Sequence, residues 1–256
     1  MEQHQPSSRQ VIKKILKKIT PTPIKKILRP IYLELVLRKY KSLELKEAFE
    51  HLYTSNLWTD RNAKTGLASG PGSTGRFVDD YCSLLSELIA QYSIRSVADL
   101  GCGNFNVGER ISRMVDRYTG VDIAETVVIN NTRAFANDHI GFLCADLTTG
   151  SLPGADAAIV RQVLQHLSNA EIQAALDNIL KTYPLAIITE HVYQGHNLKP
   201  NVDIIHGPAT RLLKNSGLFI DQPPFSITDA KLARDIHYAQ DEVLRTWVVR
   251  GRTKQP

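Results

Sequence analysis

The chain has 256 residues, of which 43% are hydrophobic and 22% charged, proportions that exclude a fibrous or disordered protein. It has no apolar run of about 18 residues, so we expect no transmembrane helix. The N-terminal residues lack the apolar segment of a secretory signal and the three cysteines are widely spaced, which together favour free thiols in the cytoplasm.

The net charge of +5 is concentrated at the N-terminus. Residues 1–46 hold twelve Lys or Arg and three acidic side chains, whereas the remaining 210 residues carry a net charge of −4. Within 11–19, apolar residues and lysines recur at helical spacing, and the helical pattern resumes at 24–35 after two prolines. We therefore interpret 1–46 as a basic amphipathic helical extension.

Three roles are open for this extension. The segment 11–39 could lie on the anionic inner face of a membrane or dock a protein partner, which is the reading we favour. It could also be a helix whose lysines are simply solvated. Nucleic acid binding is the least favoured, because the extension shows no aromatic interleaving for base stacking and the rest of the chain is slightly acidic.

Residues 47–93 read as a helical lead-in to the next domain. The apolar spacing predicts helices near 43–52 and 77–91, with a loop at Ser69-Gly-Pro-Gly-Ser73 between them. Backbone N–H groups exposed in such a turn favour anions, so the loop could be a lid or a clamp near the carboxylate of a cofactor.

From residue 94 onward, short apolar strands alternate with helical patterns. This predicts an α/β domain over 94–256, with a mostly parallel sheet and helices on both faces. The last two strands have no helical pattern between them and could pair antiparallel. Strands are predicted near 94–100, 117–122, 140–145, 155–161, 184–190, 217–221 and 242–249, and helices near 106–115, 124–137, 169–182 and 208–216.

The first strand of this domain runs into Asp99-Leu-Gly101-Cys102-Gly103. Two glycines in such a turn let a ligand approach the backbone closely. A dinucleotide-binding turn would have a third glycine where this chain has Asn106. Asp99 would repel a pyrophosphate but could receive an ammonium group, so the turn points away from NAD and toward a cofactor that carries an amino acid.

Carboxylates end the next two predicted strands. Asp122 lies 21 positions after Gly101, where a carboxylate can accept two ribose hydroxyls. Asp146 can accept a hydrogen bond from an adenine amino group while Leu147 covers the ring.

In this order, the motifs resemble the class I S-adenosylmethionine (SAM) methyltransferases. The matching pieces are Asp-Leu-Gly-Cys-Gly, Gly-Val-Asp-Ile, Ala-Asp-Leu and the segment 156–167, within roughly 95–220. The resemblance implies a Rossmann-like seven-stranded sheet whose seventh strand is inserted antiparallel. It implies SAM as cofactor, with contacts at Asp99, Gly101, Cys102, Gly103, Asp122, Ile123, Asp146 and Leu147, and with Arg161 and Gln162 facing its methionine end.

A finer resemblance is to bacterial methyltransferases encoded with polysaccharide and glycan biosynthesis genes. It is carried by the basic lead with its Lys-Lys-Ile-Leu repeats, by the Ser-Gly-Pro-Gly-Ser loop and by Asn201-Val-Asp203-Ile-Ile-His-Gly207. The resemblance implies O-methylation of a sugar. The chain departs from this group at Gln162, where an acidic residue is common, so the acceptor contacts at that position stay open.

A hydroxyl acceptor needs a base that removes its proton. His166 follows the fourth predicted strand and His191 the fifth, at the edge where open α/β sheets bind ligands. Asp203 lies in the long polar segment after His191, and such loops tend to carry function. These three are the candidate catalytic residues, although each could instead have a structural role. We interpret His196 and His206 as surface loop residues and expect no metal, because the spacing matches no recognised ligand pattern.

Three functions are carried forward from the sequence. The first is a SAM-dependent methyltransferase that O-methylates a sugar or another hydroxyl acceptor. The second is an N-methyltransferase, in which the free amine attacks without a base. The third is an inactive SAM-binding scaffold at a membrane. A nicotinamide oxidoreductase is disfavoured by the missing third glycine.

Overall fold

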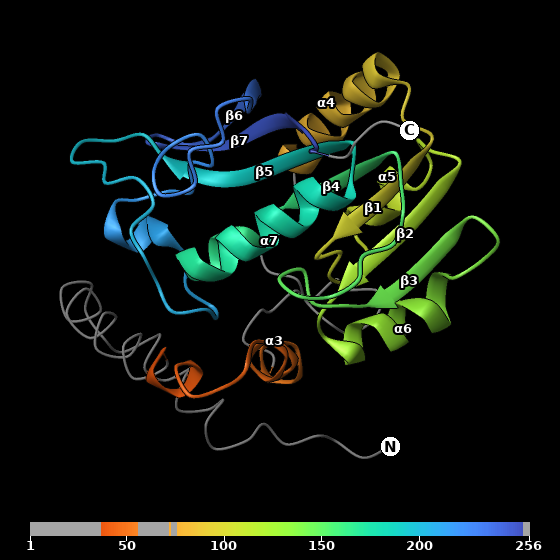
Figure 1. The fold of residues 1–256 in the computed structure, drawn as a ribbon, viewed down its shortest axis with the longest axis horizontal. Coiled ribbons are helices and arrows are strands. Elements are labelled where there is room, and N and C mark those ends of the chain that lie inside the picture. The colour runs from red at the N-terminus through yellow and green to blue at the C-terminus, as the bar shows by residue number, and fades with distance from the viewer. Residues whose placement is uncertain (1–36, 56–71, 73–75, 253–256) are drawn as a thin grey trace. The chain divides into compact units, whose positions relative to one another are not determined.

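The computed structural model describes residues 37–55, 72 and 76–252. By its internal contacts the chain divides into two units, 1–42 and 43–256. The predicted helical lead-in therefore belongs to the same unit as the sheet from Leu43 onward. Figure 1 shows the elements of this second unit.

Only a small part of the basic extension is described. Residues 37–40 form a single helical turn, and the amphipathic pattern at 11–35 lies outside the described residues. The Gly-rich loop 69–73 is described at Gly72 alone. Among the described helices, none is long and apolar enough to cross a bilayer.

The second unit is built on a seven-stranded sheet in the order β3-β2-β1-β4-β5-β7-β6 (Figure 1). β1 to β5 pair in parallel, and β7 is inserted between β5 and β6, antiparallel to both. This confirms the predicted Rossmann-like fold with its inserted antiparallel strand. The strands are β1 (Ser96–Leu100), β2 (Arg117–Asp122), β3 (Ile140–Cys144), β4 (Ala157–Arg161), β5 (Leu185–Tyr193), β6 (Lys231–Ala239) and β7 (Glu242–Arg250).

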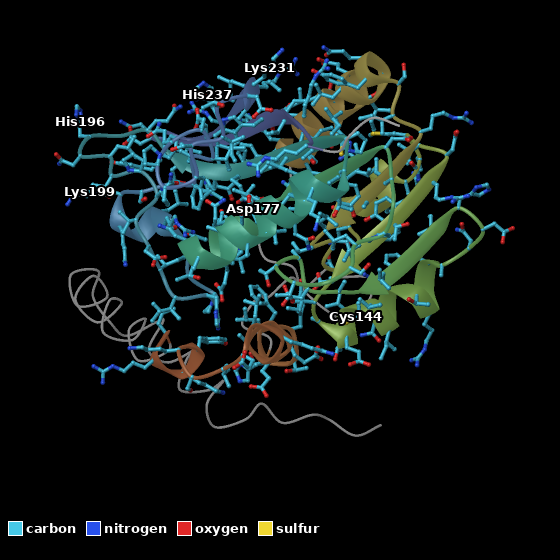
Figure 2. All side chains as sticks on the ribbon, viewed as in Figure 1. Cys144, Asp177, His196, Lys199, Lys231 and His237 are labelled. Atoms are coloured by element: carbon cyan, nitrogen blue, oxygen red, sulfur yellow. The ribbon has the colours of Figure 1, made fainter. Side chains whose placement is uncertain are left out.

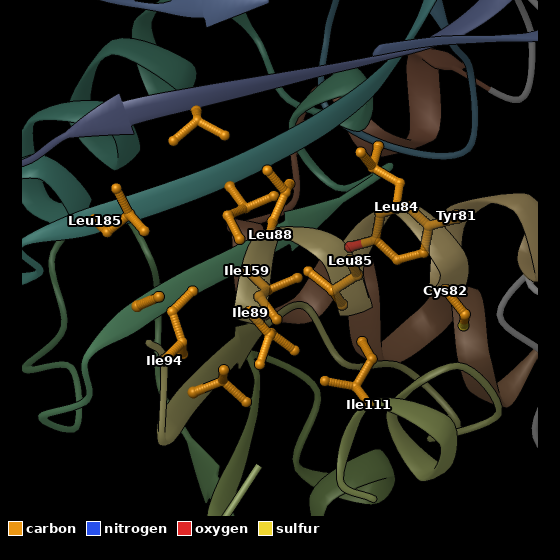
Figure 3. Close-up of a cluster of buried hydrophobic side chains, with 14 of the residues drawn as sticks. Tyr81, Cys82, Leu84, Leu85, Leu88, Ile89, Ile94, Ile111, Ile159 and Leu185 are labelled. Atoms are coloured by element: carbon orange, nitrogen blue, oxygen red, sulfur yellow. The ribbon is translucent and has the colours of Figure 1, made fainter. Parts of the chain in front are cut away.

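Helices surround this sheet. They are α3 (Leu45–Thr54), α4 (Arg76–Tyr92), α5 (Gly108–Ile111), α6 (Glu125–Phe135) and α7 (Asn169–Thr182), with the 3-10 turns η2 (Leu164–His166) and η3 (Arg211–Lys214). Leu85 and Leu88 of α4 belong to the same buried cluster as Ile159 and Ile187 of the central strands, and Figure 3 labels Leu85, Leu88 and Ile159 in it. α7 crosses the other face and begins with a complete capping box at Ser168 (Figure 1).

The sixth strand was predicted in the wrong place. Residues 217–220 are apolar and buried, but the Asn201 side chain bonds to the N–H and the carbonyl of Phe219 where a strand neighbour would. The observed β6 is an edge strand with mostly exposed side chains. It therefore lacks the hydrophobic alternation by which a half-buried strand is recognised.

Two predicted helices are much shorter than their patterns. The helix expected at 106–115 is the single turn α5, because Phe105 takes a left-handed conformation with φ 65° and buries its ring before the helix begins. The helix expected at 208–216 is reduced to η3, which ends at the left-handed Asn215.

Candidate active site

A cavity lies at the carboxyl edge of the sheet. Ligands bind at this edge in open α/β folds. Its lining comes from the ends of β1 to β4, from α3 and from η2. The residues that line it are Leu45, Phe49, Tyr53, Gly72, Asp99, Gly101, Cys102, Gly103, Asn104, Val107, Ile111, Asp122, Ile123, Asp146, Leu147, Thr148, Arg161, Gln162, Val163, His166 and Leu167.

The turn after β1 requires both of its glycines. Gly101 and Gly103 have φ values of 79° and 54°, and a Cβ on Gly101 would overlap the Val163 side chain. The Asp122 carboxylate accepts the Gly103 N–H at 3.0 Å, and the buried Asn131 amide donates to the Gly103 carbonyl at 2.7 Å. The turn is thus held rigidly at the floor of the cavity.

Asp99 is buried beside this turn. The Tyr118 hydroxyl donates to its carboxylate at 2.6 Å. Burial raises the pKa of Asp99 to about 6, whereas the Tyr118 hydrogen bond and the nearby Arg161 act in the opposite direction. A cationic ligand would stabilise the ionised form of this buried carboxyl, as expected for a group that receives an ammonium.

Arg161, at the end of β4, places a guanidinium in the same cavity. Its Nη2 donates to the Gly72 carbonyl at 2.8 Å, and its Cζ lies 5.0 Å from the centre of the Tyr81 ring. Burial lowers the pKa of the guanidinium. Its Nε is buried without a hydrogen-bond partner among the described residues.

Gly72 brings the predicted Gly-rich loop to the cavity wall. A side chain at this position would overlap the Gln162 amide. Gln162 itself has a φ of 56°, a conformation that costs free energy in a residue other than glycine, and its N–H donates to the Thr189 carbonyl at 2.8 Å. The rest of the loop lies outside the described residues.

Asp122 and Asp146 line the other half of the cavity. Asp122 accepts N–H groups from Gly103 and Ala124, both at 3.0 Å, and burial raises its pKa to about 6. Asp146 accepts the N–H and the hydroxyl of Thr148 on Oδ1, both at 2.7 Å. The two carboxylates lie at the ends of neighbouring strands and can bind hydroxyl and amino groups of one extended ligand. The predicted contacts Cys102, Ile123 and Leu147 also line the cavity.

The sequence reasoning missed α3 as part of the cavity. Leu45, Phe49 and Tyr53 line it from this helix, and Tyr53 packs on the start of α6. Glu50 accepts from the hydroxyl of Thr126, which ties the same helix to α6. The four-residue spacing of the three lining residues is the only sequence signal, and any amphipathic helix shows it.

His166 is the one predicted base that lines the cavity among the described residues. Its Nδ1 lies 3.2 Å from the Gly207 carbonyl, which can only accept, so this contact places a proton on Nδ1, and the Ala209 backbone also bonds to the ring. The Gln165 amide nitrogen faces Nε2 at 3.4 Å. Burial lowers the pKa of His166 to about 4, so the imidazole is neutral at pH 7.

His191 is not at the cavity. β5 extends to Tyr193, beyond the predicted end at 190, and His191 pairs with Leu244 inside the sheet. Its ring packs edge-on against Tyr238 at 4.7 Å, and burial lowers its pKa to about 4. Nε2 lies 3.1 Å from a Glu242 oxygen.

Asp203 is also outside the cavity lining. Its exposed carboxylate accepts the backbone N–H of Asn169 at 2.8 Å, at the start of α7, and that of Ile204 at 2.9 Å. These contacts tie the polar loop to a helix end. His206, expected at the surface, is instead partly buried, with Nδ1 2.7 Å from the Glu171 carboxylate.

Residues 97–183 match the model of a family described as a methyltransferase domain. An uncharacterized methyltransferase of Mycobacterium tuberculosis and one of Mycobacterium bovis are each 33% identical over 91 residues, which is 35% of this chain and 46% of the relative. The chain thus matches about half the length of these curated relatives.

The family match covers about a third of the chain. Among solved structures, the N-terminal domain of EvdMO1 with SAH bound has the same fold, with a TM-score of 0.51 at 12% identity over 82% of this chain and 98% of that domain. The matched segment 97–183 contains the β1 turn, Asp122, Asp146 and His166. Gly72 and α3 precede it and complete the cavity wall.

Proposed function

We propose that the protein is a SAM-dependent methyltransferase that methylates a hydroxyl group of a small-molecule or glycan acceptor, with His166 as the general base. The observation that carries the proposal is that a neutral imidazole lines the same cavity as the cofactor-binding groups. SAM supplies a methyl group activated by the positive sulfonium to which it is attached.

The cavity fits SAM by the chemistry of its side chains. Asp99 and Arg161, which both line the cavity, offer opposite charges to the ammonium and carboxylate of the methionine end. Asp122 is placed for ribose hydroxyls, and Asp146 with Leu147 for the adenine. The family match supports the same cofactor, and the EvdMO1 domain of like fold has SAH bound.

His166 can accept a hydroxyl proton at neutral pH because its pKa near 4 keeps it unprotonated. The same low pKa makes it a weak base, so we expect its contribution at the lower end of the usual range for general bases, roughly a hundredfold. Nε2 would take the proton of the acceptor hydroxyl, and bound SAM would supply the methyl group to the hydroxyl oxygen and leave as SAH. Neither His191 nor Asp203 reaches the cavity, so we assign neither this role.

A sugar is the acceptor class that we propose. The sequence resemblance to glycan-biosynthesis methyltransferases supports it, and the EvdMO1 domain was crystallised in the presence of D-fucose as well as SAH. Methylation of a sugar hydroxyl needs a base, which His166 provides. An amine acceptor would not need one, and this difference separates the two reactions.

The experiment uses the full chain with isotope-labelled SAM and a pool of host glycans and metabolites, analysed by mass spectrometry for a gain of one methyl. Methylation at pH 7.5 is expected to fall roughly a hundredfold in His166→Gln while SAH binding stays within about twofold. The control His196→Gln changes an exposed histidine that projects from the loop after β5 (Figure 2). Unchanged turnover in His166→Gln would indicate a nitrogen acceptor, and SAH binding without turnover on any pool would indicate an inactive scaffold.

We also propose that the basic segment 11–39 holds this enzyme at an anionic membrane surface on the cytoplasmic side, where glycan precursors on lipid carriers would be within reach. Its support is the excess of lysines and arginines in 1–46. Deleting residues 1–20 should abolish flotation with anionic liposomes. Equal flotation of the full and shortened chains would contradict the proposal.

A further inference from the structure

A buried carboxyl holds the turn that carries His166. Glu190 lies inside β5, fully shielded from solvent. Its Oε1 accepts the N–H groups of Val163 and Leu164 at 3.1 and 2.9 Å, and its Oε2 accepts that of Gln165 at 3.2 Å. Three consecutive backbone donors are thus bound by one side chain.

A buried guanidinium holds the other side of the same turn. Arg211 of η3 is 1% exposed. It donates to the carbonyls of Gln165 and Leu167 at 3.2 and 2.9 Å, and to the Asn169 side-chain oxygen at 2.7 Å. Arg211 and Glu190 therefore bind the donors and the acceptors of one short stretch of backbone. Neither side chain lines the cavity.

Gly207 completes the arrangement at His166 itself. Its N–H donates to the His166 carbonyl at 3.0 Å, and its own carbonyl faces His166 Nδ1 at 3.2 Å. One residue thus fixes both the backbone and the ring of His166. Because Gly207 lies four residues before Arg211, the same loop supplies both contacts.

We propose that Glu190 and Arg211 are positioning residues for His166, which orient its ring toward the acceptor and keep its proton on Nδ1. This inference rests on the proposed role of His166. Apolar side chains could fill the space beneath η2 without the cost of burying a carboxyl and a guanidinium. Glu190 and Arg211 instead fix the orientation of the turn, because each of their hydrogen bonds sets the orientation of one peptide group in it.

Two measurements on the full chain test the inference. The first is turnover with saturating SAM, together with the Kd for SAH. The second is the ¹⁵N NMR spectrum of the protein with labelled histidines. The His166 signal is assigned as the one missing from the spectrum of His166→Gln. It reports the tautomer and the pKa of His166 and does not require turnover. Glu190→Gln keeps the Oε1 contacts and loses only the one to Gln165, so it is the milder variant. Arg211→Met removes all three of its contacts.

We expect kcat to fall about tenfold in Glu190→Gln and up to a hundredfold in Arg211→Met, the loss that a misplacement of about 1 Å can cause. The Kd for SAH should stay within about twofold, since neither residue lines the cavity. The His166 signal should change from the single Nδ1-protonated form to a mixture of tautomers, and its pKa should rise toward the ordinary value of 6.5.

The matched control is Asp156→Asn. The Asp156 carboxylate also accepts two consecutive backbone N–H groups, from Arg95 and Ser96 at 2.9 and 2.7 Å, but at the opposite edge of the sheet. This variant should leave the His166 spectrum and kcat unchanged. If Arg211→Met does not fold, Arg211→Lys, which keeps the charge but not the forked geometry, takes its place.

The outcomes separate this inference from the proposed function. A folded Glu190 or Arg211 variant with an unchanged His166 spectrum and unchanged kcat overturns the positioning role. Altered tautomers in those variants, with no methyl transfer by the wild type on any pool, would uphold the positioning role and reject the proposed reaction.

Discussion

Replacing Asp122 with asparagine should weaken cofactor binding without lowering the stability of the cofactor-free protein. The buried carboxyl has a pKa of about 6 in the folded chain against an ordinary value of 3.8. A carboxyl whose folded pKa is raised favours the protonated form in the native state. At pH 7 it is ionised in both states, so its ionisation costs about 3 kcal/mol of folding free energy.

Asparagine removes that cost because it is neutral. It keeps one acceptor oxygen for the N–H of Gly103 or Ala124 and turns its amide N–H groups toward the other donor, which costs about 1–3 kcal/mol. The two effects offset, so the Tm of free Asp122→Asn at pH 7 should equal or exceed that of the wild type. Ribose hydroxyls lose a charged acceptor worth about 1.5–3 kcal/mol, a roughly 10- to 150-fold rise in the Kd for SAH.

Calorimetric titration with SAH and thermal melts with and without SAH measure both effects. The control Asp156→Asn changes an exposed carboxylate at the other sheet edge and should leave the Kd for SAH unchanged. A fall of Tm in free Asp122→Asn by more than a few degrees would refute the reasoning on burial. An unchanged Kd would refute the ribose contact.

Four further predictions follow from the same geometry. SAH should bind more weakly at pH 5.5 than at 7.5, because Asp99, with a pKa of about 6, must lose a proton before it receives the ammonium; equal calorimetric affinities would contradict this. Gly72→Ala should raise the Kd for SAH about tenfold by displacing Gln162, and a normal Kd would show that the loop adapts. Burial raises the Glu190 pKa to about 8, so the native state retains a proton that the unfolded state loses; the free energy of unfolding should fall by about 2 kcal/mol between pH 6.5 and 8, and the fall should be absent in Glu190→Gln denaturant titrations. The kcat of His191→Gln should equal that of the wild type, because the His191 side chain packs inside the sheet. A large fall in kcat would indicate that His191 has a catalytic role after all.

Most of the parallel half of the sheet was predictable because β1, β4 and β5 are buried almost throughout and its strands end in recognisable turns. β1, β2 and β4 lie within a few residues of their predicted bounds, and Asp99 and Asp122 lie where strand ends must meet. Edge strand β6 was not predictable in this way. Its pairing is specified by the backbone of β7 and by ion pairs such as Arg245 with Asp235, which leave no alternating pattern.

The cofactor half of the site was predictable for the same reason, whereas the acceptor half was not. The distance of a residue from a strand end does not determine whether its side chain reaches the cavity. His166 and His191 both seemed to follow strands, yet β5 continues past His191 and keeps it in the sheet. Glu190 had a sequence signal that was not used, since it is a lone acidic residue in the apolar strand Leu185–Tyr193.

The end of the matched segment at residue 183 separates His166 from the residues that bind the turn around it. The segment 97–183 contains His166, but Glu190, Gly207 and Arg211, which bind the turn around it, all follow residue 183. The cofactor contacts depend on strand ends that the common fold brings together, so they can be retained across distant relatives. The orientation of the base depends on a loop that meets the turn only through long-range contacts. The loop 203–214 lies outside the matched segment, and it is where residues that determine the acceptor should be sought.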